Sequence, residues 1–191
     1  MTEYIFTTDW FSYNIHNWNI CLDKFKNKQN LSFMEIGSFQ GRSAIWLLEN
    51  VLTDNSSKLY CVDTFEGSEE HDDITKKDLY NIFCHNINNF KEKVVICRGK
   101  SNEMLKKFDN NTFDMIYVDG SHFGKDVLYD IVLSYSLLKK DGIMIIDDYL
   151  WEDPPFTDGL KLAVDSFIEI YKNELEILNI GYQVYFKKIR E

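Results

Sequence analysis

Five short apolar runs dominate the sequence, and each of them ends in glycine or aspartate. In chain order they are LSFMEIG, KLYCVD, VVICRG, FDMIYVDG and GIMIIDD. Uninterrupted runs of this length are typical of parallel strands that are buried on both faces of a sheet. Helical patterns lie between them, at 42–52, 78–90, 102–108 and 124–139. Strand and helix therefore alternate, which predicts a doubly wound α/β sheet.

The chain has a different pattern before and after these runs. Before them, apolar residues recur at helical spacing after a cap at Asp9 and predict an amphipathic helix. These residues are Phe11, Ile15, Trp18, Leu22 and Phe25. After the runs, the predicted elements are a helix at about 160–172 and strands at 175–179 and 182–188. We expect the last two strands to form an antiparallel hairpin, which brings the sheet to seven strands, most of them parallel.

The length of 191 residues fits one domain with a single core. We divide it into a helical segment at 1–30, a ligand-binding core at 31–148, and a C-terminal helix and hairpin at 149–191.

The composition favours a small-molecule partner. Hydrophobic residues make up 45% of the chain and charged residues 27%, as in an ordinary globular protein. No apolar stretch is long enough for a membrane helix, and the first residues lack the pattern of a signal peptide, so we expect a cytoplasmic protein without membrane contact. The net charge of −10 argues against a nucleic-acid partner. Homo-oligomer formation is left open.

In a doubly wound sheet, ligands bind at the carboxyl ends of the strands, so the residues that end each run are the candidates for a site. The first run ends in the loop 35–41, whose glycines allow a ligand to approach the backbone. The second run ends in Asp63, 22 residues after Gly41, where a carboxylate can accept hydrogen bonds from ribose hydroxyls. The two features together predict a site for a nucleoside-containing cofactor.

The loop differs from the fingerprint of a dehydrogenase. A nicotinamide dinucleotide site has the pattern G-x-G-x-x-G, whereas residues 35–41 read E-x-G-x-x-x-G. We therefore expect a nucleoside that carries an amino acid rather than a diphosphate.

Polar residues also follow the fourth and fifth runs. They are Asp119, Gly120, Ser121 and His122 after the fourth, and Asp147 and Asp148 after the fifth. Adjacent carboxylates at the end of an apolar strand are costly unless they are solvated, hydrogen-bonded or bound to a cation. Their oxygens suit Mg²⁺ or Ca²⁺. For an isolated pair, a strand cap and a solvent-exposed carboxylate would be the simpler interpretation.

The stretch MEIGSFQGRSAIWLL resembles the first motif of class I S-adenosylmethionine-dependent methyltransferases, which have a Rossmann-like fold. The resemblance extends from about residue 30 to the C-terminus. It implies that Glu35, Gly37, Ser38 and Gly41 line the methionine and ribose, that Asp63 holds the ribose, and that Gly99 and Ser101 face the adenine, with Asp119 also beside the cofactor. Ser101 is in addition a candidate helix N-cap.

The 28 residues from Asp119 to Asp147 are similar to the metal-ligand spacing of catechol O-methyltransferases. The segments YVDGSH, IIDDY and GLKLAVDSFIEIY resemble more closely the macrocin-type sugar O-methyltransferases. This resemblance implies Mg²⁺ ligands at Asp119, Asp147 and Asp148, with Asp119 and His122 as catalytic residues and His122 as the general base.

The sequence thus predicts an O-methyltransferase that acts on a hydroxyl of a sugar, nucleotide sugar or glycoside. The alternatives are a catechol or small-phenol O-methyltransferase and a non-catalytic S-adenosylmethionine-binding module. The N-terminal helix with Trp10 and Trp18, the loop 65–75 and the loop 149–158 are candidate covers of the site, and Tyr149 or Trp151 is a candidate for stacking on an acceptor ring. We expect His16, His71 and His85 to be surface residues.

Overall fold

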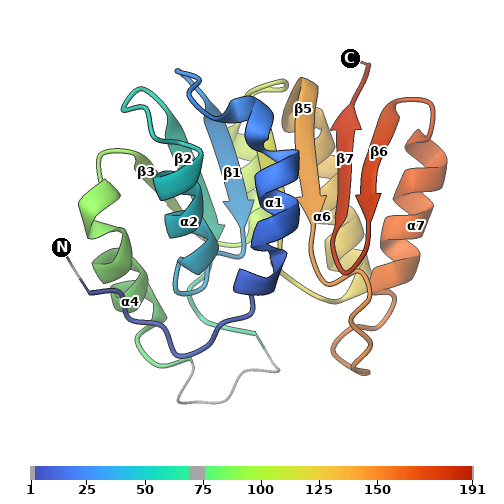
Figure 1. Cartoon of the computed structure of the whole chain (residues 1–191). Helices are drawn as coiled ribbons and strands as arrows, with labels where there is room; N and C mark the ends of the chain where they lie inside the picture. The colour runs from blue at the N-terminus through green and yellow to red at the C-terminus, as the bar shows by residue number, and fades with distance from the viewer. Residues whose placement is uncertain (1–2, 69–75, 191) are drawn as a thin grey trace.

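The computed structural model describes residues 3–68 and 76–190. Seven strands form one sheet in the order β3-β2-β1-β4-β5-β7-β6 (Figure 1). The strands are β1 (Ser32–Ile36), β2 (Lys58–Asp63), β3 (Val94–Arg98), β4 (Phe113–Val118), β5 (Leu138–Ile146), β6 (Leu175–Ile180) and β7 (Val184–Lys188). Strands β1 to β5 run parallel, whereas β7 is antiparallel to both β5 and β6. The predicted Rossmann-like fold with a C-terminal antiparallel hairpin is confirmed.

The strand order reverses beside β1. The chain builds outward from β1 to β2 and β3, then returns to place β4 on the other side of β1. Ligands of such sheets bind outside the carboxyl ends of the strands at this reversal. These ends lie at the bottom of Figure 1.

Helices cover both faces of the sheet. Helices α1 (Ile15–Cys21), α2 (Arg42–Asn50) and α4 (Leu79–Asn86) lie on one face, and α5 (Ser101–Met104), α6 (Gly124–Leu137) and α7 (Leu160–Tyr171) lie on the other. Each face has its own cluster of buried apolar side chains, so the parallel strands are covered on both sides, as their apolar sequences predicted. None of the helices in the described ranges is long and apolar enough to cross a membrane.

The N-terminal segment is less regular than predicted. Instead of one helix it forms a 3₁₀ turn at Ser12–Asn14, α1, and a second 3₁₀ turn at Asp23–Phe25. The N-cap of the first turn is Phe11 rather than the predicted Asp9, whose carboxylate accepts a hydrogen bond from the Ser12 backbone N–H at 2.9 Å. Within α1 the Asn19 side chain donates a hydrogen bond to the Ile15 carbonyl at 3.0 Å.

Strand β5 begins earlier than predicted. The helical pattern at 124–139 ends at Leu137, and Leu138 already pairs with Phe113 of β4. The chain stays in the sheet through a register shift, with Asp141 in the left-handed region at φ 64° just before Gly142. The prediction treated these turn-forming residues as the end of an element, whereas here they form an irregularity within it.

Candidate active site

The loop after β1 is shaped by its glycines. Gly37 has a φ of 85°, and a Cβ at this position would lie 1.7 Å from the backbone oxygen of Asp119. Gly41 has a φ of 82° and precedes the first residue of α2. Only glycine meets both requirements of Gly37, a left-handed backbone and close contact with a neighbouring strand end. The loop therefore lies directly against the end of β4.

Asp63 holds this loop in place from the end of β2. Its Oδ2 accepts hydrogen bonds from the backbone N–H groups of Ser38, at 2.8 Å, and Phe39, at 2.7 Å. Its Oδ1 accepts a hydrogen bond from Phe65 N at 2.6 Å. Each carboxylate oxygen has two lone pairs, so Asp63 is able to hold the loop and also accept a hydrogen bond from a ribose hydroxyl.

Glu35 lies beneath the loop. Its side chain is fully buried and accepts a hydrogen bond from Ser43 Oγ in the first turn of α2. Burial raises the pKa of Glu35 to about 7. The sequence predicts that Glu35 lines the cofactor. In the structure its carboxylate contacts the base of the loop, because the side chain points into the layer between the sheet and α2.

Gly99 and Ser101 follow β3. Gly99 N donates a hydrogen bond to the Asp63 carbonyl at 2.9 Å, so this turn lies beside the carboxylate that holds the loop. Ser101 is the first residue of α5 and makes no capping bond, since the N-cap is Lys100. Its hydroxyl instead pairs with Asp130, a buried residue of α6 whose pKa is raised to about 6 by burial. The predicted N-cap role of Ser101 is therefore wrong.

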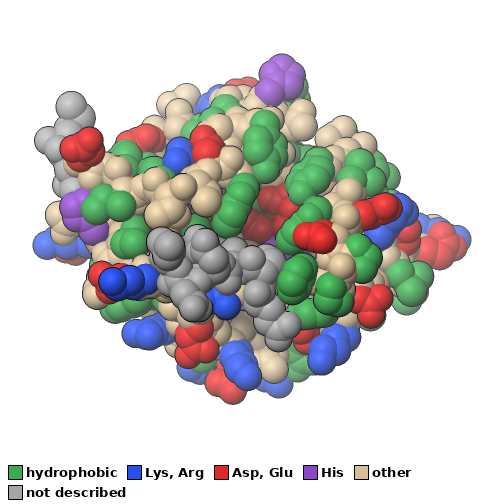
Figure 2. All heavy atoms as spheres, turned by 90° about the horizontal axis from the view of Figure 1, so that it is seen from below, with side chains coloured by type: hydrophobic (Ala, Val, Ile, Leu, Met, Phe, Trp, Pro, Cys, Tyr) green, Lys and Arg blue, Asp and Glu red, His purple; other side chains and the backbone are tan. Residues whose placement is uncertain are grey.

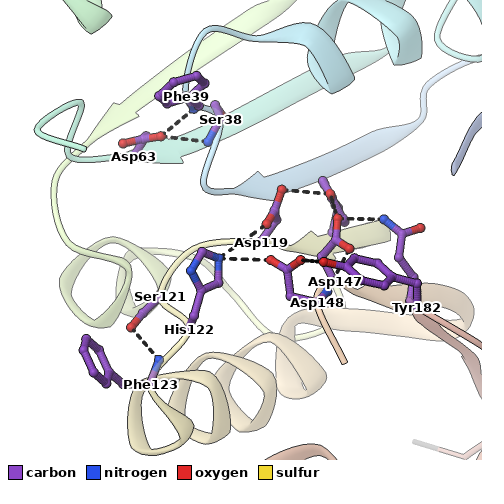
Figure 3. A network of polar contacts seen from close by, with 12 residues as sticks. Ser38, Phe39, Asp63, Asp119, Ser121, His122, Phe123, Asp147, Asp148 and Tyr182 are labelled. Atoms are coloured by element: carbon purple, nitrogen blue, oxygen red, sulfur yellow. Dashed lines mark hydrogen bonds and ion pairs between the residues drawn. The ribbon is translucent and has the colours of Figure 1, made fainter. Parts of the chain in front are cut away.

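The structure brings Asp119, His122 and Asp148 together (Figure 3). His122 Nε2 lies 3.1 Å from Asp148 Oδ2 and 4.0 Å from Asp119 Oδ1. One ligand atom from each of the three residues lies within 4.8 Å of the others. Two carboxylates and an imidazole are a donor set that fits a divalent cation. Burial, together with the nearby Asp147 carboxylate, raises the pKa of Asp119 well above its ordinary value.

Asp147 points into the protein. Its Oδ1 accepts a hydrogen bond from Asp148 N at 2.8 Å, and its Oδ2 accepts one from Gln183 Nε2 at 2.7 Å. The Tyr117 hydroxyl bonds to the same Oδ2 and also lies 2.8 Å from Asp119 Oδ2. The structure thus places the third predicted metal ligand behind the cluster, where it contacts Asp119 through Tyr117.

The profile of a family described as a methyltransferase domain matches residues 34–149 of the chain. The chain belongs to this methyltransferase family. The matched region includes the last three residues of β1, all of β2 to β5, and every site residue predicted from the sequence. The predicted class, the class I S-adenosylmethionine-dependent methyltransferases, is confirmed.

A relative and two solved structures are similar to this chain. Uncharacterized protein R132 of Acanthamoeba polyphaga mimivirus is 26% identical over 144 residues, which are 74% of this chain and 61% of that protein. The chain thus spans about three fifths of this relative. The O-methyltransferase NovP has a TM-score of 0.69 at 19% identity, covering 93% of this chain and 80% of its own. MycE of the mycinamycin biosynthetic pathway has a TM-score of 0.63 at 14% identity, covering 96% and 51%.

The sequence analysis did not identify the residues that support the acidic cluster. Gln183 is held by two donors to its Oε1, the Tyr185 hydroxyl and the indole N–H of Trp18, the latter at 2.8 Å. Its amide group is therefore turned toward Asp147. The sequence contained a signal for Tyr117, because strand alternation places it on the same face as Asp119. It contained none for Gln183 or Trp18, which are 165 residues apart.

The other predicted residues take different places. Trp151 packs its ring on that of His122, with centroids 4.8 Å apart. Tyr149 is buried, and its hydroxyl donates a hydrogen bond to Asp165, so it does not face an acceptor. His16 and His85 are exposed, as expected. His71 and most of the candidate cover at 65–75 lie outside the described residues.

Proposed function

We propose that the chain transfers a methyl group from S-adenosylmethionine to a hydroxyl of a sugar or sugar conjugate, with Mg²⁺ as an aid. One observation carries this proposal. Gly37, in the loop assigned to the cofactor, lies against the backbone of Asp119, in the cluster assigned to the acceptor. The two half-sites therefore meet where the strand order reverses, so that two bound reactants would be neighbours.

For the cofactor, we assign Gly37, Ser38 and Gly41 to the methionine and ribose, and Asp63 to the ribose hydroxyls. Gly99 and Ser101 follow the neighbouring strand and would lie along the adenine. When bound, S-adenosylmethionine supplies a methyl group on a positively charged sulfur. The glycine loop suits such a ligand because its backbone allows close approach without side-chain interference.

For Mg²⁺, we assign oxygens of Asp119 and Asp148. When bound, the cation would lower the pKa of an acceptor hydroxyl. Asp147, predicted from the sequence as a third ligand, has hydrogen-bond donors at both oxygens. We therefore propose that Asp147 orients Asp148 and, through Tyr117, Asp119.

His122 is the proposed general base. Its side chain is mostly buried, and its Nε2 faces the carboxylates of Asp119 and Asp148. In the neutral tautomer with its proton on Nδ1, Nε2 can accept the proton of an acceptor hydroxyl. The acceptor oxygen would then keep the electron pair that forms the new O–CH₃ bond, while the electron pair of the broken S–CH₃ bond would remain on sulfur. The two carboxylates would then stabilise the imidazolium. Trp151 limits the movement of the ring.

The descriptions of two similar structures are consistent with this choice of reaction. NovP is described as an O-methyltransferase, and the MycE structure is a complex with Mg, S-adenosylhomocysteine and mycinamycin VI. In this chain, the pair of carboxylates beside an imidazole supports the same choice.

The test is transfer of labelled methyl from S-adenosylmethionine to a panel of glycosides, nucleotide sugars and catechols, with Mg²⁺ or with a chelator. We expect transfer to one sugar class, reduced by the chelator. Transfer that the chelator leaves unchanged would overturn the proposed role of Mg²⁺. Transfer to catechols alone would establish the catechol or small-phenol alternative. Tight cofactor binding with no transfer to any hydroxyl compound would favour the non-catalytic binding module.

A further inference from the structure

The N-terminal segment lies beside the cofactor loop, residues 37–41. Residues 3–10, which we call the strap, pass from α4 across α2 to α1 at the lower edge of Figure 1, where the strands have their carboxyl ends. Figure 2 views the molecule from this edge, where acidic side chains lie in a hollow between hydrophobic ones. Asn86 of α4 accepts a hydrogen bond from the Ile5 N–H and donates one to the Ile5 carbonyl, both at 2.8 Å. Because Asn86 is fully buried, it anchors the strap to the body of the protein.

Gln40 joins the strap to the cofactor loop. Its Oε1 accepts a hydrogen bond from Thr7 N at 2.8 Å, and its Nε2 donates one to Thr7 Oγ1 at 2.9 Å. Its backbone carbonyl accepts a further hydrogen bond from Asn86 Nδ2 at 2.8 Å. The Gln40 side chain is only 2% exposed. Both of its polar atoms therefore bind the strap, although the residue belongs to the loop.

Phe39, the neighbour of Gln40, has a backbone conformation that needs support. Its φ of 48° lies in the left-handed region, where a residue other than glycine is strained and stays only if surrounding contacts hold it. Asp63 accepts a hydrogen bond from its N–H. The Trp10 ring of the strap packs on the Phe39 ring, with centroids 5.4 Å apart. The loop is thus held from two directions in the sequence, by β2 and by the strap.

Arg42 adds contacts to the strap directly after the loop. It is the first residue of α2, and its Nε donates a hydrogen bond to the Thr8 carbonyl at 3.2 Å. Its guanidinium lies over the Phe6 ring, 4.1 Å from the centroid, and forms an ion pair with Asp9 at 3.4 Å. The strap therefore contacts the chain on both sides of Gly41.

We propose that Gln40 is a positioning residue for the cofactor, which acts by tying the cofactor loop to the strap. This inference rests on the proposed assignment of the loop to S-adenosylmethionine. With the strap in place, the loop has its binding conformation before the ligand arrives, so less conformational freedom is lost on binding. Without these contacts, Phe39 can leave the left-handed region. The loop then moves away from Asp63, the carboxylate assigned to the ribose.

The first test is calorimetric titration of the full chain with S-adenosylhomocysteine. Gln40→Ala removes both hydrogen bonds to Thr7, and we expect about tenfold weaker binding. Thr7→Ala removes only the bond to the hydroxyl and should weaken binding about threefold. In the double variant, Thr7→Ala should have no further effect, because its partner atom is already gone. This non-additivity would assign the effect to the contact between loop and strap.

Hydrogen exchange measured by NMR separates positioning from a general loss of stability. Coupling between two sites is reciprocal, so a strap that favours cofactor binding must itself be stabilised by the cofactor. S-adenosylhomocysteine should therefore slow exchange of the Thr7 N–H in the unmodified chain, by a factor similar to the affinity loss in Gln40→Ala. In Gln40→Ala this protection should disappear, and the N–H groups of Ser38 and Phe39 should exchange faster.

Ser57→Ala is the matched control. Ser57 is fully buried and directly precedes β2, and its Oγ accepts a hydrogen bond from Leu31 N at 3.1 Å. The substitution removes a buried hydrogen bond at the amino ends of the strands, opposite the site. It should lower the unfolding midpoint while the affinity for S-adenosylhomocysteine changes by less than about twofold.

Four results would overturn the inference. They are unchanged affinity in Gln40→Ala, an equal loss of affinity in Ser57→Ala, additive losses in the double variant, and exchange of the Thr7 N–H that S-adenosylhomocysteine does not alter. If Gln40→Ala does not fold, Thr7→Ala and the exchange of the unmodified chain decide the question. Failure of the unmodified chain to bind S-adenosylhomocysteine would instead contradict the proposed function, so the two failures are distinguishable.

Discussion

The two halves of the site are built in different ways, although they lie at the same edge of one sheet. The half at β1 and β2 consists mainly of backbone. It is a loop with two glycines in the left-handed region, and Asp63 accepts hydrogen bonds from the backbone N–H groups of Ser38 and Phe39. The half at β4 and β5 consists of side chains, in which Asp119, Asp147 and His122 are oriented by other side chains. The first half therefore depends mainly on local geometry, and the second on contacts between distant parts of the chain.

This difference predicts how each half responds to mutation. Substitution in the backbone half should disturb folding and cofactor binding together, because the same atoms shape the loop and face the ligand. In the side-chain half, single substitutions should reduce turnover or metal response while the fold and cofactor affinity persist.

The largest expected effect is that of Gly37→Ala. The new Cβ would lie 1.7 Å from the Asp119 carbonyl oxygen at a left-handed φ, so we expect a loss of about 3 kcal/mol or more in the free energy of unfolding. Chemical denaturation measures it. Gly181→Ala is the control, since its nearest neighbour would be 3.6 Å away, and it should change stability by less than about 1 kcal/mol. Equal unfolding midpoints for the two variants would contradict the close contact of the loop with β4.

His122→Ala should have the next largest effect, on turnover alone. Loss of a general base lowers kcat by about 10²–10⁴-fold, while the affinity for S-adenosylmethionine should stay within about twofold. Methyl-transfer kinetics and calorimetric titration give the two quantities. His16→Ala, at an exposed histidine of α1, should leave both unchanged. A His122→Ala variant with full turnover would remove His122 from the mechanism.

Asp63→Asn tests whether the two halves of the site act independently. The amide retains only one oxygen acceptor, so at least one of the three backbone hydrogen bonds is lost, and we expect about tenfold weaker binding of S-adenosylhomocysteine. Asp148→Asn should instead keep this affinity and weaken Mn²⁺ binding, measured by electron paramagnetic resonance. If both variants lost cofactor affinity equally, the two halves would not be independent.

The smallest expected effect concerns pH and Glu35. Its pKa of about 7 in the folded protein exceeds the ordinary value, so the stability associated with its protonated form is present below about pH 4.5 and is lost as pH rises through 7. Compared with Glu35→Gln, the unmodified chain should lose on the order of 1–3 kcal/mol between pH 5 and pH 8. Thermal unfolding at a series of pH values tests this. The exposed Glu49→Gln should show no such difference.

The backbone half was predictable because its signals are local. The spacing of glycines and of Asp63 reflects a strand, a tight turn and a helix that follow one another in the sequence. The five apolar runs are local signals too, and they form the parallel strands β1 to β5, whose carboxyl ends lie at the same edge of the sheet. Errors arose where turn residues occur within an element, as at Asp141, and in the N-terminal segment, where two 3₁₀ turns flank a short helix.

The side-chain half was predictable only in part. The sequence identified Asp119, His122, Asp147 and Asp148 as polar residues that follow β4 and β5, and it assigned all three aspartates to the metal without a signal for which of them point inward. That depends on Gln183 and Trp18, whose hydrogen bonds turn Asp147 inward.

The sequence by itself thus determined the order of strands and helices, the glycine loop and the set of polar residues at the strand ends, because each follows from residues within a few positions of one another. The tertiary structure decided which carboxylates meet, which one is held behind the cluster, and which aromatic rings flank it. These depend on side chains that are far apart in the sequence and meet only when the hairpin and the N-terminal segment pack onto the sheet.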